Sequence, residues 1–302
     1  MKKIVFRTND FGISNLPRTR KEQFKDIVKN QYRTLLLFGL FIFLFSIPFL
    51  LAYSFRIISN VSLSASLIKK ELTNSEINSA LLVQTVMFDA INIPCYMIIS
   101  ISLAGFSNIF KNIIFADGVL FKSDFKNGLK QNLKYFLLSG FIYGTEQLII
   151  NLISNYAALS NQLFVNILAG FLIVTFYSLV IPMLLFFTVN HTIYEMKISS
   201  GFSNSLIATI SRFGFCLLIG LVFYLLRFVD IIPFPYIKIL IHILFLVLIF
   251  PFFYLICILF GFSSYDKLIN EIHHPDLFHK GLSSFVNQND GEKYGQSSFK
   301  KH

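Results

Sequence analysis

Long uncharged runs recur along this chain of 302 residues, and they constrain its fold more than any other feature of the sequence. The first run, residues 35–55, is long enough to cross the roughly 30 Å hydrocarbon core of a bilayer as a helix. Charged residues make up 14% of the sequence, against about 25% in soluble domains, so these runs cannot all face water. Membrane barrel strands alternate polar and apolar residues, and these runs do not. The sequence therefore predicts an all-α, polytopic bundle of transmembrane helices.

The charged stretches between the runs divide the bundle into about six spans. The first run follows a mostly polar segment, so we expect it to be a retained anchor and not a cleavable signal peptide. We predict a cytoplasmic N-terminal segment (residues 1–34), a transmembrane domain (35–262) and a cytoplasmic tail (263–302) with a disordered end. The expected spans are residues 35–55, 90–110, 135–153, 164–189, 213–232 and 239–262.

The positions of Lys and Arg indicate the orientation of these spans. Most of them fall in the N-terminal segment, the second and fourth loops and the tail, which all lie on one side of a six-span bundle. Because cytoplasmic loops carry an excess of Lys and Arg, both termini are expected on the cytoplasmic side of the membrane. This asymmetry, with attraction to anionic lipid, accounts for the net charge of +10, so we expect no nucleic-acid partner.

Two segments on the predicted cytoplasmic side have the pattern of amphipathic helices that lie on a membrane surface. In the first, Thr19 and Glu22 fit a capping box, and apolar residues follow at helical spacing towards the first span. The second, residues 123–136, has one apolar stripe and leads into the third span. A stripe of identical spacing precedes the fifth span, which is expected either from a duplicated unit or from any helix entering a membrane obliquely. The candidate docking surface for a partner consists of Phe125, Leu129, Phe202 and Leu206.

Ionisable residues within the spans are candidates for a functional site, because a charge in hydrocarbon is costly and marks function or pairing. Glu146 and Arg227 lie deep in the third and fifth spans, and Asp89, Asp230 and His242 lie towards the outer face. One interpretation is an outward-facing polar pocket with Glu146 and Arg227 at its base. The other is an ion pair between Glu146 and Arg227 that holds the helices together.

The motifs of common membrane enzymes and of ATPases are absent from the sequence. It contains neither G-x-x-x-x-G-K-[ST] nor H-E-x-x-H, and its three cysteines lack metal-ligand spacing. A serine nucleophile would need a base at the same depth, but Ser107 and His242 fall at opposite ends of their spans. We therefore expect no catalytic residues, no metal and no cofactor.

Three polar stretches carry a family resemblance: residues 9–12 with 17–24, residues 104–132, and Pro275 with residues 279–282. Together with the span pattern, they resemble the YesL-like family of bacterial integral membrane proteins, which is catalogued as a domain of unknown function. The resemblance implies a link to carbohydrate uptake, and it carries over no catalytic residues.

The expected function is accessory or regulatory: the protein supports carbohydrate uptake, and the amphipathic helices dock subunits of a sugar importer or a second copy of the chain. The cytoplasmic loops lack the coupling motif of an importer permease, which disfavours a direct permease role. The alternative is a small-solute transporter that uses the outer polar pocket. An intramembrane enzyme is the least favoured class, and the substrate is not readable from the sequence.

Overall fold

The computed structural model describes residues 16–69, 73–160 and 162–283, and this part of the chain consists of helices without strands. The stretch 9–12 and the tail after residue 283 lie outside the described residues. The all-α prediction is confirmed. The helices are α1 (Arg20–Asn30), α2 (Tyr32–Lys69), α3 (Asn74–Ile114), α4 (Phe121–Ser160), α5 (Leu163–Thr175), α6 (Ile181–Ile193), α7 (Ile198–Ser211), α8 (Phe213–Leu225), α9 (Pro235–Leu244), α10 (Phe250–Tyr265) and α11 (Glu271–His273).

Short π-helical and 3-10 turns join several of these helices into longer rods. The π turns are η3 (Phe176–Val180), which joins α5 to α6, η5 (Phe245–Ile249), which joins α9 to α10, and η6 (Asp266–Asn270), which extends α10. The 3-10 turn η4 (Leu226–Ile231) ends α8. Five continuous helices are long and apolar enough to cross a membrane: Tyr32–Leu63, Leu82–Ile114, Phe121–Ala157, Leu163–Ile193 and Pro235–His273.

The remaining crossing is formed by α8. It belongs to a bent pair, Ile198–Ser211 with Phe213–Val229, whose halves meet at 97°. An ion pair of 2.8 Å joins Arg20 of α1 to Asp266 after α10, so the described ends of the chain lie at the same end of the bundle. Two ends on one side require an even number of crossings, and we therefore count α8 as the fifth of six. The protein is thus a multi-pass membrane protein, as predicted.

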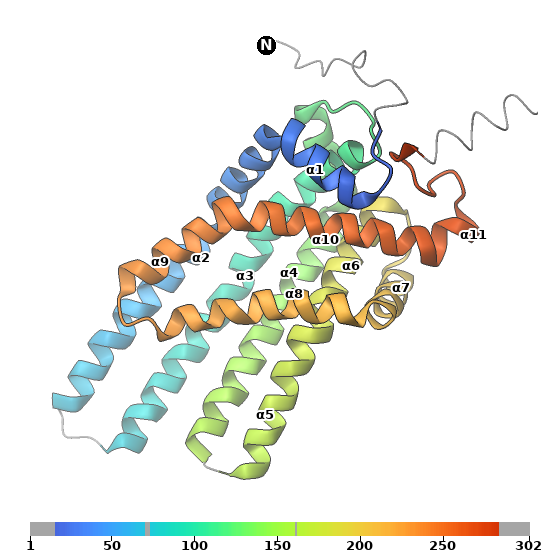
Figure 1. Ribbon diagram of the computed structural model, residues 1–302. Coiled ribbons are helices and arrows are strands. Elements are labelled where there is room, and N and C mark those ends of the chain that lie inside the picture. The colour runs from blue at the N-terminus through green and yellow to red at the C-terminus, as the bar shows by residue number, and fades with distance from the viewer. Residues whose placement is uncertain (1–15, 70–72, 161, 284–302) are drawn as a thin grey trace, which may run out of the picture.

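The helices pack in two orientations (Figure 1). Helices α2, α3, α4 and α5–α6 run side by side, whereas α8 and α9–α10 cross them at an angle. Small residues allow the backbones to approach closely, as is usual between membrane helices. A Cβ at Gly144 of α4 would lie 2.9 Å from the Ile93 Cα atom of α3, and a Cβ at Gly128 would lie 2.6 Å from the Ala104 carbonyl oxygen.

The two predicted amphipathic segments behave differently in the structure. Thr19 caps α1 as predicted, because its hydroxyl accepts from the Glu22 N–H, while the Glu22 carboxylate accepts from the Arg18 N–H and not from that of Thr19. The predicted surface helix at 123–136 is the first part of α4 and continues without a break into the third crossing. The matching stripe lies on α7, which is bent away from α8 at Arg212. The two stripes therefore occupy different structural settings, and the structure gives no support for a duplicated unit.

Two π turns press carbonyl oxygens against glycines of neighbouring crossings. A Cβ at Gly220 of α8 would lie 2.0 Å from the Tyr177 oxygen of η3, and a Cβ at Gly39 of α2 would lie 2.2 Å from the Val247 oxygen of η5. A π turn inserts an extra residue into a helix, and such turns are frequent at functional sites. Both turns lie beside the cavity described below.

Candidate functional site

A cavity of about 380 Å³ lies between the crossing helices. At ~30 Å³ per molecule, this is space for about a dozen waters or for one small solute. Its walls come from α2, α3, α4, α8, η4 and the two rods that contain η3 and η5. Three charged residues line it, namely Arg56, Asp89 and Arg227. The other polar lining residues include Asn92, Ser100, Ser139, Gln147, Asn151, Ser154, Asn155, Thr188, His242 and five tyrosines.

The charged residues are joined by one chain of hydrogen bonds across four elements. Arg56 of α2 donates to Asp89 Oδ1 of α3 at 3.1 Å, and Asn151 of α4 donates to Asp89 Oδ2 at 3.1 Å. Arg227 of η4 donates to Asn151 Oδ1 at 2.6 Å. Asp89 is only 5% exposed. Such pairing offsets the cost of placing ionisable groups between membrane helices.

His242 lines the cavity opposite aromatic side chains. Its Nδ1 lies 2.8 Å from the Lys238 carbonyl oxygen, which only accepts, so Nδ1 carries the proton. In this tautomer of the neutral imidazole, Nε2 is an acceptor. The ring packs against Tyr53, with centroids 4.8 Å apart, and Tyr96 packs edge-on to Tyr143 at the same centroid distance.

Three of the five residues that the sequence nominated for a pocket line this cavity: Asp89, Arg227 and His242. Asp230 lies in η4, and its side chain is outside the described part of the structure. Glu146 does not line the cavity, and it makes no ion pair with Arg227, which binds Asn151 instead.

Helix geometry explains why Glu146 is excluded. On α4 the lining side chains include Tyr143, Gln147, Asn151 and Ser154, which recur every three or four residues on one face. Glu146 lies one position before Gln147, about 100° around the helix from it. This polar stripe is the sequence signal that points to the site. Arg56 was also missed, because it follows an uncharged run and was assigned to a loop.

Most of the predicted docking surface is used within the fold. Phe125 is half-buried, with its ring centroid 5.4 Å from that of Phe41, and Leu129 is also half-buried. Phe202 stacks on Phe187 at 4.3 Å. Leu206, which is 44% exposed, is the member of this set that remains accessible.

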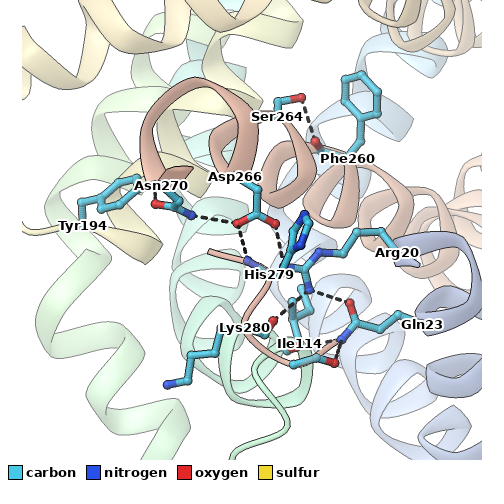
Figure 2. Close-up of polar contacts among 11 residues, drawn as sticks. Arg20, Gln23, Ile114, Tyr194, Phe260, Ser264, Asp266, Asn270, His279 and Lys280 are labelled. Carbon is cyan, nitrogen blue, oxygen red and sulfur yellow. Dashed lines mark hydrogen bonds and ion pairs between the residues drawn. The ribbon is translucent and has the colours of Figure 1, made fainter. Parts of the chain in front are cut away.

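A second polar cluster ties the two ends of the chain together (Figure 2), and we name it the terminal clasp: Arg20, Gln23, Asp266, Asn270 and Lys280. Asp266 is 2% exposed and accepts hydrogen bonds from Arg20 Nη2 at 2.8 Å and from Asn270 Nδ2 at 2.9 Å. Arg20 also donates to the Lys280 carbonyl oxygen, and Gln23 donates to the Ile114 carbonyl oxygen at the end of α3. Both carboxylate oxygens of Asp266 thus accept hydrogen bonds from other side chains. This pattern is typical of a residue that stabilises the fold.

Other contacts around the terminal clasp reinforce it. Burial raises the pKa of the Tyr194 phenol, which stays protonated and donates to the Asn270 side-chain oxygen. Gly281 has a φ of +83°, and a Cβ there would lie 1.9 Å from the Ile114 oxygen, so this close approach requires glycine. Lys280 also pairs with Asp117 at 3.2 Å. Described residues from all three stretches that carry the family resemblance therefore meet near the clasp.

Two further observations bear on the type of site: the search for metal-binding clusters and the comparisons with known proteins. Among the described residues, no group of three or more His, Cys, Asp or Glu side chains is placed to hold a metal ion, and the three cysteines are buried. Comparisons with protein-family models, curated proteins and solved structures found no match. The YesL-like resemblance and its link to carbohydrate uptake stay predictions.

Proposed function

We propose that this protein is a membrane transporter for a small polar solute, which it binds in the central cavity. The observation that carries the proposal is the length of the cavity lining on α4, in which polar side chains recur from Ser139 to Asn155. Lining residues on α4 extend from Phe136 to Asn155, a rise on the order of 28 Å along the helix axis. This approaches the roughly 30 Å thickness of the hydrocarbon core. A cavity lined over this length, with polar side chains at several depths, is suited to passing a solute from one side of the bundle to the other.

The two π turns at the cavity supply the flexibility that such passage needs. Tyr177 of η3 and Phe245 of η5 both line the hollow. Each turn lies on the rod of one crossing and presses against a glycine of another crossing, Gly220 for η3 and Gly39 for η5. Shifting the extra residue of a π turn along its helix would re-aim these two rings without breaking the rod.

The proposal places the protein in the cytoplasmic membrane of a bacterial cell, with α1 and the terminal clasp on the cytoplasmic side. The basic loops support this orientation, because they join the crossings at the end of the bundle where α1 lies. An accessory role in carbohydrate uptake rests on the family resemblance alone. The docking surface expected for that role is mostly packed within the chain, which is why we favour transport.

A cavity-filling variant and a matched control test the proposal. Ser154→Phe fills the hollow from α4, whereas Thr145→Phe adds the same ring to the same helix at a residue outside the lining. The full chain in nanodiscs is screened by thermal unfolding against a library of water-soluble metabolites, and solutes that stabilise it are then assayed for flux in proteoliposomes.

We expect at least one solute to stabilise and to cross with the native chain and with Thr145→Phe, but not with Ser154→Phe. Stabilisation that survives Ser154→Phe would place binding outside the cavity. A solute that binds in the cavity without crossing would overturn transport and leave a receptor.

A further inference from the structure

The cavity wall has an unequal balance of charge. Two guanidinium groups, Arg56 and Arg227, line it, whereas Asp89 is the one carboxylate among the described lining residues. Both oxygens of Asp89 are already used, one by Arg56 and the other by Asn151. The carboxylate is the ion-pair partner of Arg56, whereas Arg227 bonds to Asn151.

Among the described residues, no carboxylate forms an ion pair with Arg227. Within the described part of the chain its guanidinium has one hydrogen-bond partner, the neutral amide oxygen of Asn151. An arginine has five N–H donors, so most of them remain available on a half-buried side chain at the cavity. A cation between membrane helices without a counter-charge is costly, and an anion in the cavity would offset this cost.

We propose that the cavity selects an oxyanion, namely a small solute with a carboxylate group that is bound by the free edge of the Arg227 guanidinium. This inference rests on the proposed function and names its substrate class. The planar guanidinium matches a carboxylate with two parallel hydrogen bonds. Asn151 holds the guanidinium in place from its other side, through the chain that ends at Arg56.

The rest of the lining suits the body of such a solute. Tyr96 and Tyr143 contribute apolar ring surface to the same wall, and in the neutral tautomer with Nδ1 protonated, His242 Nε2 is an acceptor for a hydroxyl or amine donor. A hydroxy or aromatic carboxylate fits this combination, and its volume is well within about 380 Å³.

The test compares carboxylates with neutral molecules of the same shape, using the full chain in phosphatidylcholine nanodiscs. The probes are lactate and benzoate, paired with lactamide and benzamide, and their dissociation constants are measured by calorimetry. We expect the two acids to bind and the two amides to bind roughly 10- to 100-fold more weakly, because a hydrogen bond to a charged group is lost.

Two substitutions locate the effect. Arg227→Gln is expected to weaken carboxylate binding by a similar factor, whereas Arg33→Gln removes the same charge at an exposed position outside the cavity and is expected to change nothing. If Arg227→Gln does not fold, the acid–amide comparison on the native chain still decides the question.

Each outcome has a distinct meaning. Equal binding of acids and amides, abolished by Ser154→Phe, would overturn the oxyanion inference and leave the cavity proposal intact. If the acids do not bind, and adding phosphatidylglycerol to the nanodiscs raises the unfolding temperature of the native chain but not of Arg227→Gln, the oxyanion would be a lipid headgroup and the solute would be excluded. If no probe binds and the metabolite library yields none either, both proposals fail.

Discussion

Removing the carboxylate of Asp266 is expected to release α1 from the end of the bundle. The Arg20 and Asp266 side chains are 10% and 3% exposed, and their charged atoms lie 2.8 Å apart. Asp266→Ala leaves the Arg20 guanidinium buried without its counter-charge. Breaking a buried pair by removing one partner costs about 3–5 kcal/mol, most of which is the penalty of the stranded charge.

A second, exposed ion pair serves as a control for the cost of breaking the buried pair. Lys280 and Asp117 also pair at this end of the bundle, at 3.2 Å, but their side chains are 30% and 49% exposed. Exposed pairs contribute about 0–1 kcal/mol, because solvent screens them and the side chains lose entropy. Asp117→Ala therefore removes a carboxylate from the same region at little expected cost.

Limited proteolysis measures the release directly. Trypsin cuts after Lys25 and Lys29 of α1 only when that helix unfolds locally, so at low protease concentration the cleavage rate follows the open population. Since about 1.4 kcal/mol is a factor of ten, Asp266→Ala should speed cleavage at these two bonds by roughly a hundredfold or more. Asp117→Ala should speed it by about fivefold or less, and mass spectrometry identifies the fragments.

The double variant Arg20→Ala/Asp266→Ala separates the ion pair from the packing of α1. Because it removes the stranded charge as well, its cost should fall well below the sum of the two single variants. Equal cleavage rates for Asp266→Ala and Asp117→Ala, or full additivity in the double variant, would refute the reasoning that the buried pair holds α1 in place.

Two further predictions concern the crossing helices. Gly220→Ala places a Cβ 2.0 Å from the Tyr177 oxygen and should destabilise by about 1–3 kcal/mol in thermal unfolding. Gly170→Ala meets nothing within 4 Å, so it should leave the unfolding temperature unchanged or raise it, and a loss there would contradict the clash as the cause. Glu146→Gln should leave the dissociation constant of any cavity solute unchanged, because Glu146 lies outside the cavity lining. Weaker binding in Glu146→Gln would place Glu146 at the site.

The crossings could be predicted from the sequence because hydrocarbon excludes charge, so each gap between charges marks one helix. The fifth illustrates this, since the predicted span 213–232 coincides with α8 and η4. The 97° bend before it was not predicted, because it depends on the backbone angles of one residue, Arg212 (φ −118°, ψ 28°), in a segment that otherwise has helical spacing.

The cavity could be predicted only in part, because the sequence gives the depth of a charge but not the face of the helix that carries it. Glu146 and Gln147 have nearly the same depth, yet only Gln147 lines the cavity. The hydrogen-bond partners of a charged residue also could not be predicted from the sequence. Arg227 is held by Asn151, an uncharged residue on another crossing, and not by the deeper carboxylate that the sequence suggested.

The terminal clasp can form only late in biosynthesis, because its residues lie near both ends of the chain. Asp266 leaves the ribosome 246 residues after Arg20, which at about 5–20 residues per second is a delay of roughly 12–50 s. During that interval α1 is already made, while the carboxylate that neutralises its arginine does not yet exist. Docking of the first helix is therefore among the last events of maturation. A nascent chain that stalls before Asp266 therefore lacks the ion pair that holds α1 in the finished molecule.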